Sequence, residues 1–105
     1  MNLPWNRGVY VLRVGDHVKV GASTNVTERL KGAGAFIPPG AELVCIIACA
    51  VSQDPLWLEK EVHLALQGWH VEREWFHWND HTLKILEAQE PWWMEIHLSN
   101  EKISG

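Results

Sequence analysis

Five side chains in this sequence are of the types that handle protons, phosphates and metal ions. They are Tyr10, Lys19, Arg29, Glu59 and His63. A carboxylate can hold a divalent cation, a guanidinium can clamp a phosphate, and a phenol, an amine or an imidazole can move a proton. Together these groups are the parts that metal-assisted hydrolysis of a phosphodiester requires. The elements that position them decide whether they can act together.

The first part of the chain predicts a β-hairpin. Two short apolar runs, rich in β-branched residues, flank the dipeptide Gly15-Asp16, which suits a tight turn. We expect the two strands over residues 8–14 and 17–22. Tyr10 and Lys19 lie nine residues apart on opposite arms, so the turn can bring these two proton-handling side chains together.

A short helix is expected directly after the hairpin. Asn25 and Glu28, three residues apart, resemble a capping box with asparagine as the cap. Val26 and Leu30 then begin an apolar stripe with helical spacing. Arg29 lies beside this stripe, so it can sit at the rim of the sheet.

A strand and a second helix follow, and the helix carries Glu59 and His63. Residues 42–51 form the longest uninterrupted apolar run and favour a strand buried on both faces, although periodicity alone leaves a buried helix open. Asp54-Pro55 is a helix start, with aspartate as the cap and proline in the first turn. We expect this helix to run to about residue 67, with Glu59 and His63 as an i, i+4 pair on one face.

The order of the elements predicts an α+β fold. Residues 71–78 indicate either a short strand or an aromatic loop that closes the core, and a third helix is expected over about 81–89. The order β-β-α-β-α-α then gives a small three-stranded antiparallel sheet flanked by helices. We interpret residues 1–105 as a single domain with a core of about 8–90 and a C-terminal tail of 91–105.

The composition indicates a folded protein in a reducing compartment. The chain has 105 residues, of which 47% are hydrophobic, enough for one modest core. It has no apolar run of about 18 residues, which argues against a membrane span, and its start lacks the apolar stretch of a secretory signal. The two cysteines lie in one apolar run and, on a strand, stand too far apart to form a disulfide. We therefore expect a cytoplasmic protein.

The charge argues against a simple nucleic-acid-binding domain. The formal net charge is −4 and the pI is near 5.8, whereas such domains usually carry a basic field that neutralises phosphates. Residues 1–40 nevertheless carry five basic side chains against two acidic ones. A locally positive surface on an acidic domain is therefore compatible with the sequence.

In the order and spacing of its motifs, the chain resembles the GIY-YIG nuclease superfamily. Gly8-Val9-Tyr10 stands where Gly-Ile-Tyr is expected, and Lys19-Val20-Gly21 stands about ten residues on, where Tyr-Ile-Gly is expected. Arg29 matches the helix arginine of the superfamily, and Glu59 matches its metal-binding glutamate on a later helix. The stretch Arg73-Glu74-Trp75-Phe76 looks like the phage-associated branch.

The resemblance implies a GIY-YIG-like fold and a divalent-metal-dependent endonuclease that hydrolyses DNA, single- or double-stranded. One ion, Mg²⁺ or Mn²⁺, would sit on Glu59, Tyr10 would orient or deprotonate the attacking water, and Arg29 would stabilise charge on the scissile phosphate. Lys19 replaces the second tyrosine. It could act as a base only if its pKa fell well below about 10.4, and otherwise it would be an electrostatic clamp. His63 is either a site residue or a packed helix histidine.

Two other classes of function are open on the same sequence. One is a nucleic-acid-binding or regulatory module that keeps the fold and cleaves poorly, motivated by the missing tyrosine and the net acidity. The other is a protein-interaction domain that uses the aromatic tail Trp92-Trp93-Met94.

Several further residues carry competing interpretations. The histidines of the second half suggest a zinc site, although structural zinc usually employs cysteines with short paired spacings; they are His63, His70, His77 and His81. Asn79 could correspond to a later catalytic asparagine of the superfamily. For the motif Arg73-Glu74-Trp75-Phe76 we favour a salt-bridged loop and aromatic closure of the core over a base-stacking platform.

Overall fold

The computed structural model describes residues 7–32, 40–48, 54–88 and 93–95. Six strands, three α-helices and a 3₁₀-helix are found in these ranges. In chain order they are β1 (Gly8–Val14), β2 (His17–Ser23), α1 (Val26–Gly32), β3 (Glu42–Ala48), α2 (Pro55–Ala65), η2 (Gln67–Trp69), β4 (His70–Glu72), β5 (Trp75–His77), α3 (Asp80–Glu87) and β6 (Trp93–Glu95).

The strands form one antiparallel sheet in the order β4-β5-β2-β1-β3-β6. The predicted three-stranded sheet is therefore wrong, because six strands pair in the described residues. Residues 71–78 were expected to form either a short strand or a loop, and they contain β5. The three strands beyond the predicted sheet, β4, β5 and β6, are each only three residues long. Such a segment is too short to show the alternation that identifies a strand in sequence, and tertiary pairing determines its conformation.

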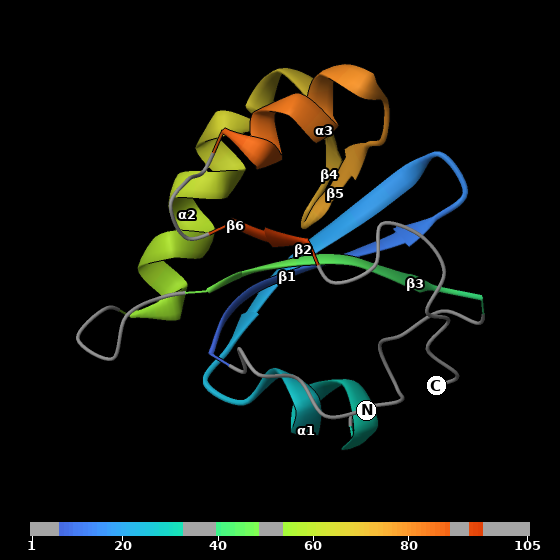
Figure 1. Ribbon diagram of the computed structural model, residues 1–105. Coiled ribbons are helices and arrows are strands. Elements are labelled where there is room, and N and C mark those ends of the chain that lie inside the picture. The colour runs from blue at the N-terminus through green and yellow to red at the C-terminus, as the bar shows by residue number, and fades with distance from the viewer. Residues whose placement is uncertain (1–6, 33–39, 49–53, 89–92, 96–105) are drawn as a thin grey trace.

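The helices cover the two faces of the sheet in separate layers, as Figure 1 shows, with α1 on one side and α2 and α3 on the other. On the α2 face, side chains from β1, β2 and β3 pack against residues of α2 and α3 such as Leu58, Val62 and Leu86. On the α1 face, Val26 and Leu30 of the helix pack with Tyr10, Leu12 and neighbouring strand residues. Burial of these apolar surfaces on both faces provides the main driving force for the fold.

The predicted hairpin is confirmed. β1 and β2 pair antiparallel from Gly8↔Ser23 to Val14↔His17, with Gly15 in the turn at φ +60°. The Nε–H of Arg13 donates to the carbonyl oxygen of Gly15 at 2.9 Å, which ties the turn to the strand before it. Because the register is fixed, the residues that face α1 and those that face α2 alternate along both strands.

The predicted central strand is confirmed over Glu42–Ala48, and residues 49–51 lie outside the described residues. Leu43 to Ala48 are buried, as expected for a strand covered on both faces. The register against β1 shifts between Val11, opposite Cys45, and Leu12, opposite Leu43, so Val44 has no partner on β1. This bulge turns both Val44 and Cys45 towards the α2 face, where both join the same core.

The caps predicted for the first two helices are confirmed. The N–H of Glu28 donates to Asn25 Oδ1 at 3.1 Å, and the N–H of Leu56 donates to Asp54 Oδ1 at 2.9 Å. For α3, Asn79 is the N-cap, and its side-chain oxygen accepts hydrogen bonds from backbone N–H groups of the first turn. The backbone N–H of Asn79 in turn donates to the hydroxyl of Thr82. These bonds satisfy backbone donors that the first turn of a helix leaves free.

No helix among the described residues is both long and apolar enough to cross a membrane.

Candidate functional site

Lys19 and Arg29 line one cleft on the α1 side of the sheet. The cleft has a volume of about 410 Å³, and its described lining also includes Arg73, Glu74 and Trp75. Lys19 comes from β2, Arg29 is exposed on α1, and the others come from the β4–β5 turn and the start of β5. The hairpin, the first helix and a short strand pair therefore bring three cations to one hollow.

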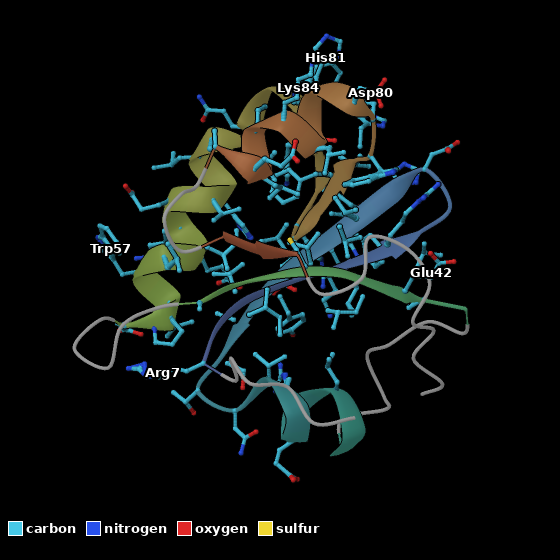
Figure 2. All side chains as sticks on the ribbon, in the orientation of Figure 1. Arg7, Glu42, Trp57, Asp80, His81 and Lys84 are labelled. Carbon is cyan, nitrogen blue, oxygen red and sulfur yellow. The ribbon has the colours of Figure 1, made fainter. Side chains whose placement is uncertain are left out.

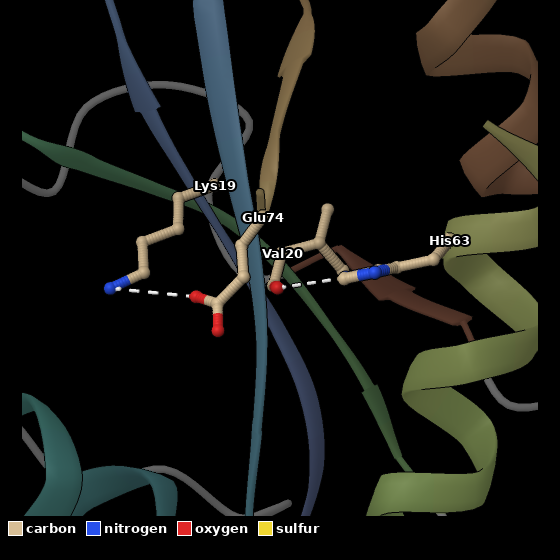
Figure 3. Close-up of polar contacts among 4 residues, drawn as sticks. All are labelled: Lys19, Val20, His63 and Glu74. Carbon is tan, nitrogen blue, oxygen red and sulfur yellow. Dashed lines mark hydrogen bonds and ion pairs between the residues drawn. The ribbon is translucent and has the colours of Figure 1, made fainter. Parts of the chain in front are cut away.

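Lys19 forms an ion pair inside this cleft. Its Nζ lies 3.8 Å from Oε2 of Glu74, and the Lys19 side chain is only 13% exposed. Figure 3 shows the amine and the carboxylate directed towards each other beside β2. This geometry favours a role for Lys19 as a positive clamp over a role as a base.

Glu59 on α2 is electrostatically linked to the same groups. Burial raises the pKa of the half-buried Glu59 carboxyl above its ordinary value of 4.5; the charge of His63 opposes this rise, Glu74 adds to it, and Lys19 opposes it. Such couplings act over short distances in a protein. Glu59 is therefore coupled to Lys19 and Glu74 of the cleft by charge, although α2 and α1 lie on opposite faces of the sheet (Figure 1).

The edge of β2 explains how a helix on the far face reaches the cleft. The N–H of Val20 donates to the carbonyl oxygen of Glu74 at 3.0 Å, and the carbonyl oxygen of Val20 lies 3.1 Å from His63 Nε2 (Figure 3). A carbonyl only accepts, so Nε2 of His63 carries the proton and donates it. The imidazole also packs edge-on against Phe76, with ring centroids 5.1 Å apart. His63 thus docks α2 on the outer edge of β2, one turn from Glu59.

Tyr10 lies on the same face of the sheet as Lys19, beneath α1. The register pairs Tyr10 with Gly21 and Leu12 with Lys19, so Tyr10 and Lys19 are diagonal neighbours. Tyr10 is 4% exposed and packs with Val26 of α1. A Cβ atom on Gly21 would lie 2.5 Å from the Tyr10 hydroxyl oxygen, so glycine is required there for the phenol to lie over β2.

The comparison with known families adds one finding to this geometry. Residues 7–90 match the T5orf172 domain. The chain belongs to this phage-associated family. The matched range contains every predicted site residue, from Tyr10 to His63, and the cleft-lining residues Arg73 to Trp75. No curated protein and no solved structure matches the chain.

Two residues that line the cleft, Arg73 and Glu74, lie on the tight turn between β4 and β5. From the sequence we interpreted this segment as a salt-bridged loop. Arg73 has a φ of +49°, the left-handed region that non-glycine residues seldom adopt. The turn brings Glu74 across to Lys19 on β2, so its ion pair is with another strand and not within the loop. Trp75 lines the cleft, whereas Phe76 is buried in the core. A sequence shows neither this backbone conformation nor the pairing of β5 with β2.

Asn79 and three of the histidines in the second half of the chain are not among the described residues that line the cleft. Asn79 caps α3, with its Oδ1 accepting from the backbone N–H groups of His81 and Thr82. His70 Nε2 lies 2.8 Å from the carbonyl oxygen of Arg73, His77 packs against His17, and His81 stacks on Trp69. Within the described ranges, His, Cys, Asp and Glu side chains form no group of three that could hold a metal ion.

A single hard cation is nevertheless compatible with the carboxylates of the domain. Mg²⁺ is commonly bound through one or two carboxylates plus water and substrate phosphates, without a complete cage of protein ligands. Glu59 is half-buried, and the negative charge of Glu74 disfavours its ionised form. A divalent cation would stabilise the ionised carboxylate of Glu59, offsetting both the cost of burying its charge and the repulsion from Glu74. The carboxylate of Glu59 is therefore a donor of the type that such an ion accepts.

The raised pKa of Glu59 predicts a pH-dependent stability. A carboxyl whose pKa is higher in the folded chain stabilises the fold when protonated; this contribution is present below pH 4.5 and is lost as the pH rises through the folded-state pKa. We expect Glu59→Gln, which stays neutral, to melt at a higher temperature than the unaltered domain near neutral pH in EDTA. Thermal unfolding across a pH series should show this difference vanish below about pH 4.5. A difference that did not change with pH would contradict the assignment.

Proposed function

We propose that this T5orf172 domain is a divalent-metal-dependent endonuclease of the GIY-YIG type, which hydrolyses phosphodiester bonds in DNA. The observation that carries the proposal is an open cleft lined by Lys19 and Arg29, with Glu59 coupled electrostatically to Lys19 and Glu74 of that cleft. Two cations beside a hard-cation ligand match the charge pattern of phosphodiester hydrolysis, in which negative charge grows on the phosphate oxygens.

Each residue has a separate role in this proposal. Arg29 is exposed on α1, so its guanidinium is free to swing onto a bound phosphate and to form paired hydrogen bonds with its oxygens. Lys19 is less exposed and supplies a fixed positive charge, with Glu74 holding its amine in place. His63 is a positioning residue, because its bond to Val20 sets the distance between α2 and the cleft.

Glu59 would hold the divalent ion, either magnesium or manganese. When bound, such an ion polarises a phosphate oxygen and lowers the pKa of a coordinated water. Tyr10 lies on the same sheet face as Lys19, with its hydroxyl over the backbone of Gly21. A phenol in this position would orient the attacking water, and its phenolate form would accept the proton of that water. Lys19 is held in an ion pair with Glu74 and acts as the clamp in this scheme, so Tyr10 is the candidate for proton transfer.

The burial of Tyr10 favours a second candidate function. At 4% exposure the phenol belongs to the packed core beneath α1, and a buried hydroxyl reaches an attacking water poorly. On this reading the domain binds nucleic acid through the same cations and cleaves weakly. Binding that falls with rising salt, without cleavage in any divalent metal, is the result that would favour it.

The test of the proposed function is a cleavage assay with matched charge variants. Purified protein is incubated with end-labelled single- and double-stranded DNA in magnesium, in manganese and in EDTA. We expect cleavage only with a divalent metal, and a loss of about 100-fold for Arg29→Ala, because one group that stabilises transition-state charge is typically worth about that factor.

Lys84→Ala is the matched control for this assay. Lys84 is an exposed cation on α3, on the opposite side of the sheet from α1 (Figure 2). We expect this variant to cleave like the unaltered domain. Cleavage in EDTA, or equal cleavage by the Arg29→Ala and Lys84→Ala proteins, would contradict the proposal.

A further inference from the structure

A second hollow adjoins the cleft, and Trp75 lines both. The second hollow has a volume of about 270 Å³. Its described lining consists of Val14, His17, Val71, Glu72 and Trp75.

The pairing of the strands shows how the two hollows are related. Lys19 lies opposite Trp75 and His17 lies opposite His77 on β5. His17 and Lys19 are two residues apart on β2, so both face the α1 side, about 7 Å from each other along the strand. The second hollow is thus the next position along the same sheet face, towards the hairpin turn. A sugar that joins a phosphate to its base spans a distance of this order.

The lining of the second hollow suits a flat heterocycle better than a phosphate. Two valines and the half-buried indole of Trp75 supply apolar surface, and Val71 is 42% exposed. Lys and Arg are absent from its described lining, whereas Glu72 contributes a carboxylate that repels anions. A carboxylate accepts hydrogen bonds from the amino groups on base edges. The volume lies below the roughly 300–1,000 Å³ of pockets that bind drug-sized ligands, which is appropriate for one small ring system.

A base can reach this hollow only when it is outside a double helix. In a duplex both faces of each base are covered by its neighbours, so stacking on a protein side chain requires an unpaired or extruded nucleotide. The net charge of −4 makes the attraction of the whole chain for DNA weak. Stacking, which does not depend on charge, then contributes a large share of the affinity.

We propose that the hollow lined by Val14, His17, Val71, Glu72 and Trp75 binds one unpaired nucleobase through stacking on Trp75. The adjoining phosphate lies between Lys19 and Arg29, so this inference rests on the proposed function of that cleft. It makes single-stranded or locally unpaired DNA the substrate class of the domain.

The test measures binding separately from cleavage. Fluorescence anisotropy in EDTA compares a labelled single-stranded oligonucleotide with an abasic one of the same length and charge, and with a duplex. We expect the unaltered domain to bind the base-bearing strand about tenfold more tightly than the abasic strand, and more tightly than the duplex. Trp75→Leu keeps the apolar volume but lacks the aromatic face, so it should bind both single strands equally.

Two further variants keep the test decisive. Trp75→Phe restores an aromatic face and should recover most of the tenfold preference. Trp57→Leu is the matched control, because Trp57 on α2 is 53% exposed and Figure 2 shows it pointing away from the sheet. Thermal unfolding of each variant establishes that it is folded. If Trp75→Leu does not fold, the preference of the unaltered domain and its retention in Trp75→Phe decide the matter.

The outcomes separate this inference from the proposed function. Equal binding of base-bearing and abasic strands by the unaltered domain overturns the base site, even if the domain cleaves DNA in magnesium. A preference that Trp75→Leu abolishes supports the base site, even if no cleavage occurs and the nuclease proposal fails.

Discussion

Replacing Glu59 with glutamine is expected to lower magnesium-dependent DNA cleavage by about 1,000-fold or more. The reason is that a neutral amide binds a hard divalent cation much more weakly than a carboxylate does. A metal ion contributes several kcal/mol of transition-state stabilisation, and each 1.36 kcal/mol is a factor of ten in rate. Cleavage of labelled DNA under single-turnover conditions measures the loss.

The same variant should keep its affinity for DNA. Glu59→Gln removes a negative charge near Lys19 and Glu74 without changing the size of the side chain, so binding in EDTA should be unchanged or tighter. Glu61→Gln is the matched control, because Glu61 is an exposed carboxylate on the same helix. If Glu59→Gln cleaved as fast as Glu61→Gln, then Glu59 would not be the metal ligand.

Gly8→Ala is expected to destabilise the domain by about 3 kcal/mol, from backbone strain and overpacking together. Gly8 has a φ of +152°, which side chains of L-residues rarely adopt. A Cβ atom there would collide with the carbonyl oxygen of Ile47 on β3 and lie 3.0 Å from the Cα of Ala48. Both are backbone atoms of a paired strand, so neither can move without breaking the sheet.

Substitutions at two other glycines distinguish the two contributions to this loss of stability, backbone strain and the collision of the added Cβ. Gly15 has a φ of +60° with nothing within 4 Å of an added Cβ, so Gly15→Ala carries the backbone strain without the collision and should cost about 1 kcal/mol. Gly68 has open space around an added Cβ, and Gly68→Ala should be neutral within about 0.5 kcal/mol. Urea unfolding of the three variants measures their free energies of unfolding and so ranks the three losses of stability. A cost at Gly8 no larger than that at Gly15 would contradict the collision.

The long elements of the fold were predictable because local signals and burial agree on them. The hairpin, the buried strand β3 and the starts of α1 and α2 follow from apolar periodicity and from the caps at Asn25 and Asp54. Residues 71–78, which contain β5, were expected to form either a short strand or a loop, and the sequence did not predict β4 or β6 as further strands. Each of these three strands is three residues long and is held by hydrogen bonds to a neighbouring strand, and this pairing has no signature in local sequence.

The residues of the candidate site also divide into those with a local signal in the sequence and those whose position depends on tertiary pairing. Lys19, Arg29 and Glu59 were singled out by residue type and by order along the chain. Lys19 and Arg29 line one cleft, and Glu59 is coupled electrostatically to Lys19 and Glu74. Trp75 was interpreted as part of the core because an aromatic residue in a short apolar segment usually is. Its position on the α1 face depends on the register of β5 against β2. That register is a tertiary property, which no spacing within residues 71–78 indicates.

The docking of α2 on the edge of β2 through His63 has a consequence for synthesis of the protein. A nascent chain that ends after β3 already contains Lys19 and Arg29, but it lacks Glu59, Glu74 and Trp75. On the proposed function, such a chain carries phosphate-binding cations and no metal ligand, so a prematurely terminated product does not cleave DNA. Activity would begin only after α2 and the β4–β5 turn have emerged and closed on the hairpin, which ties the onset of cleavage to the completion of folding.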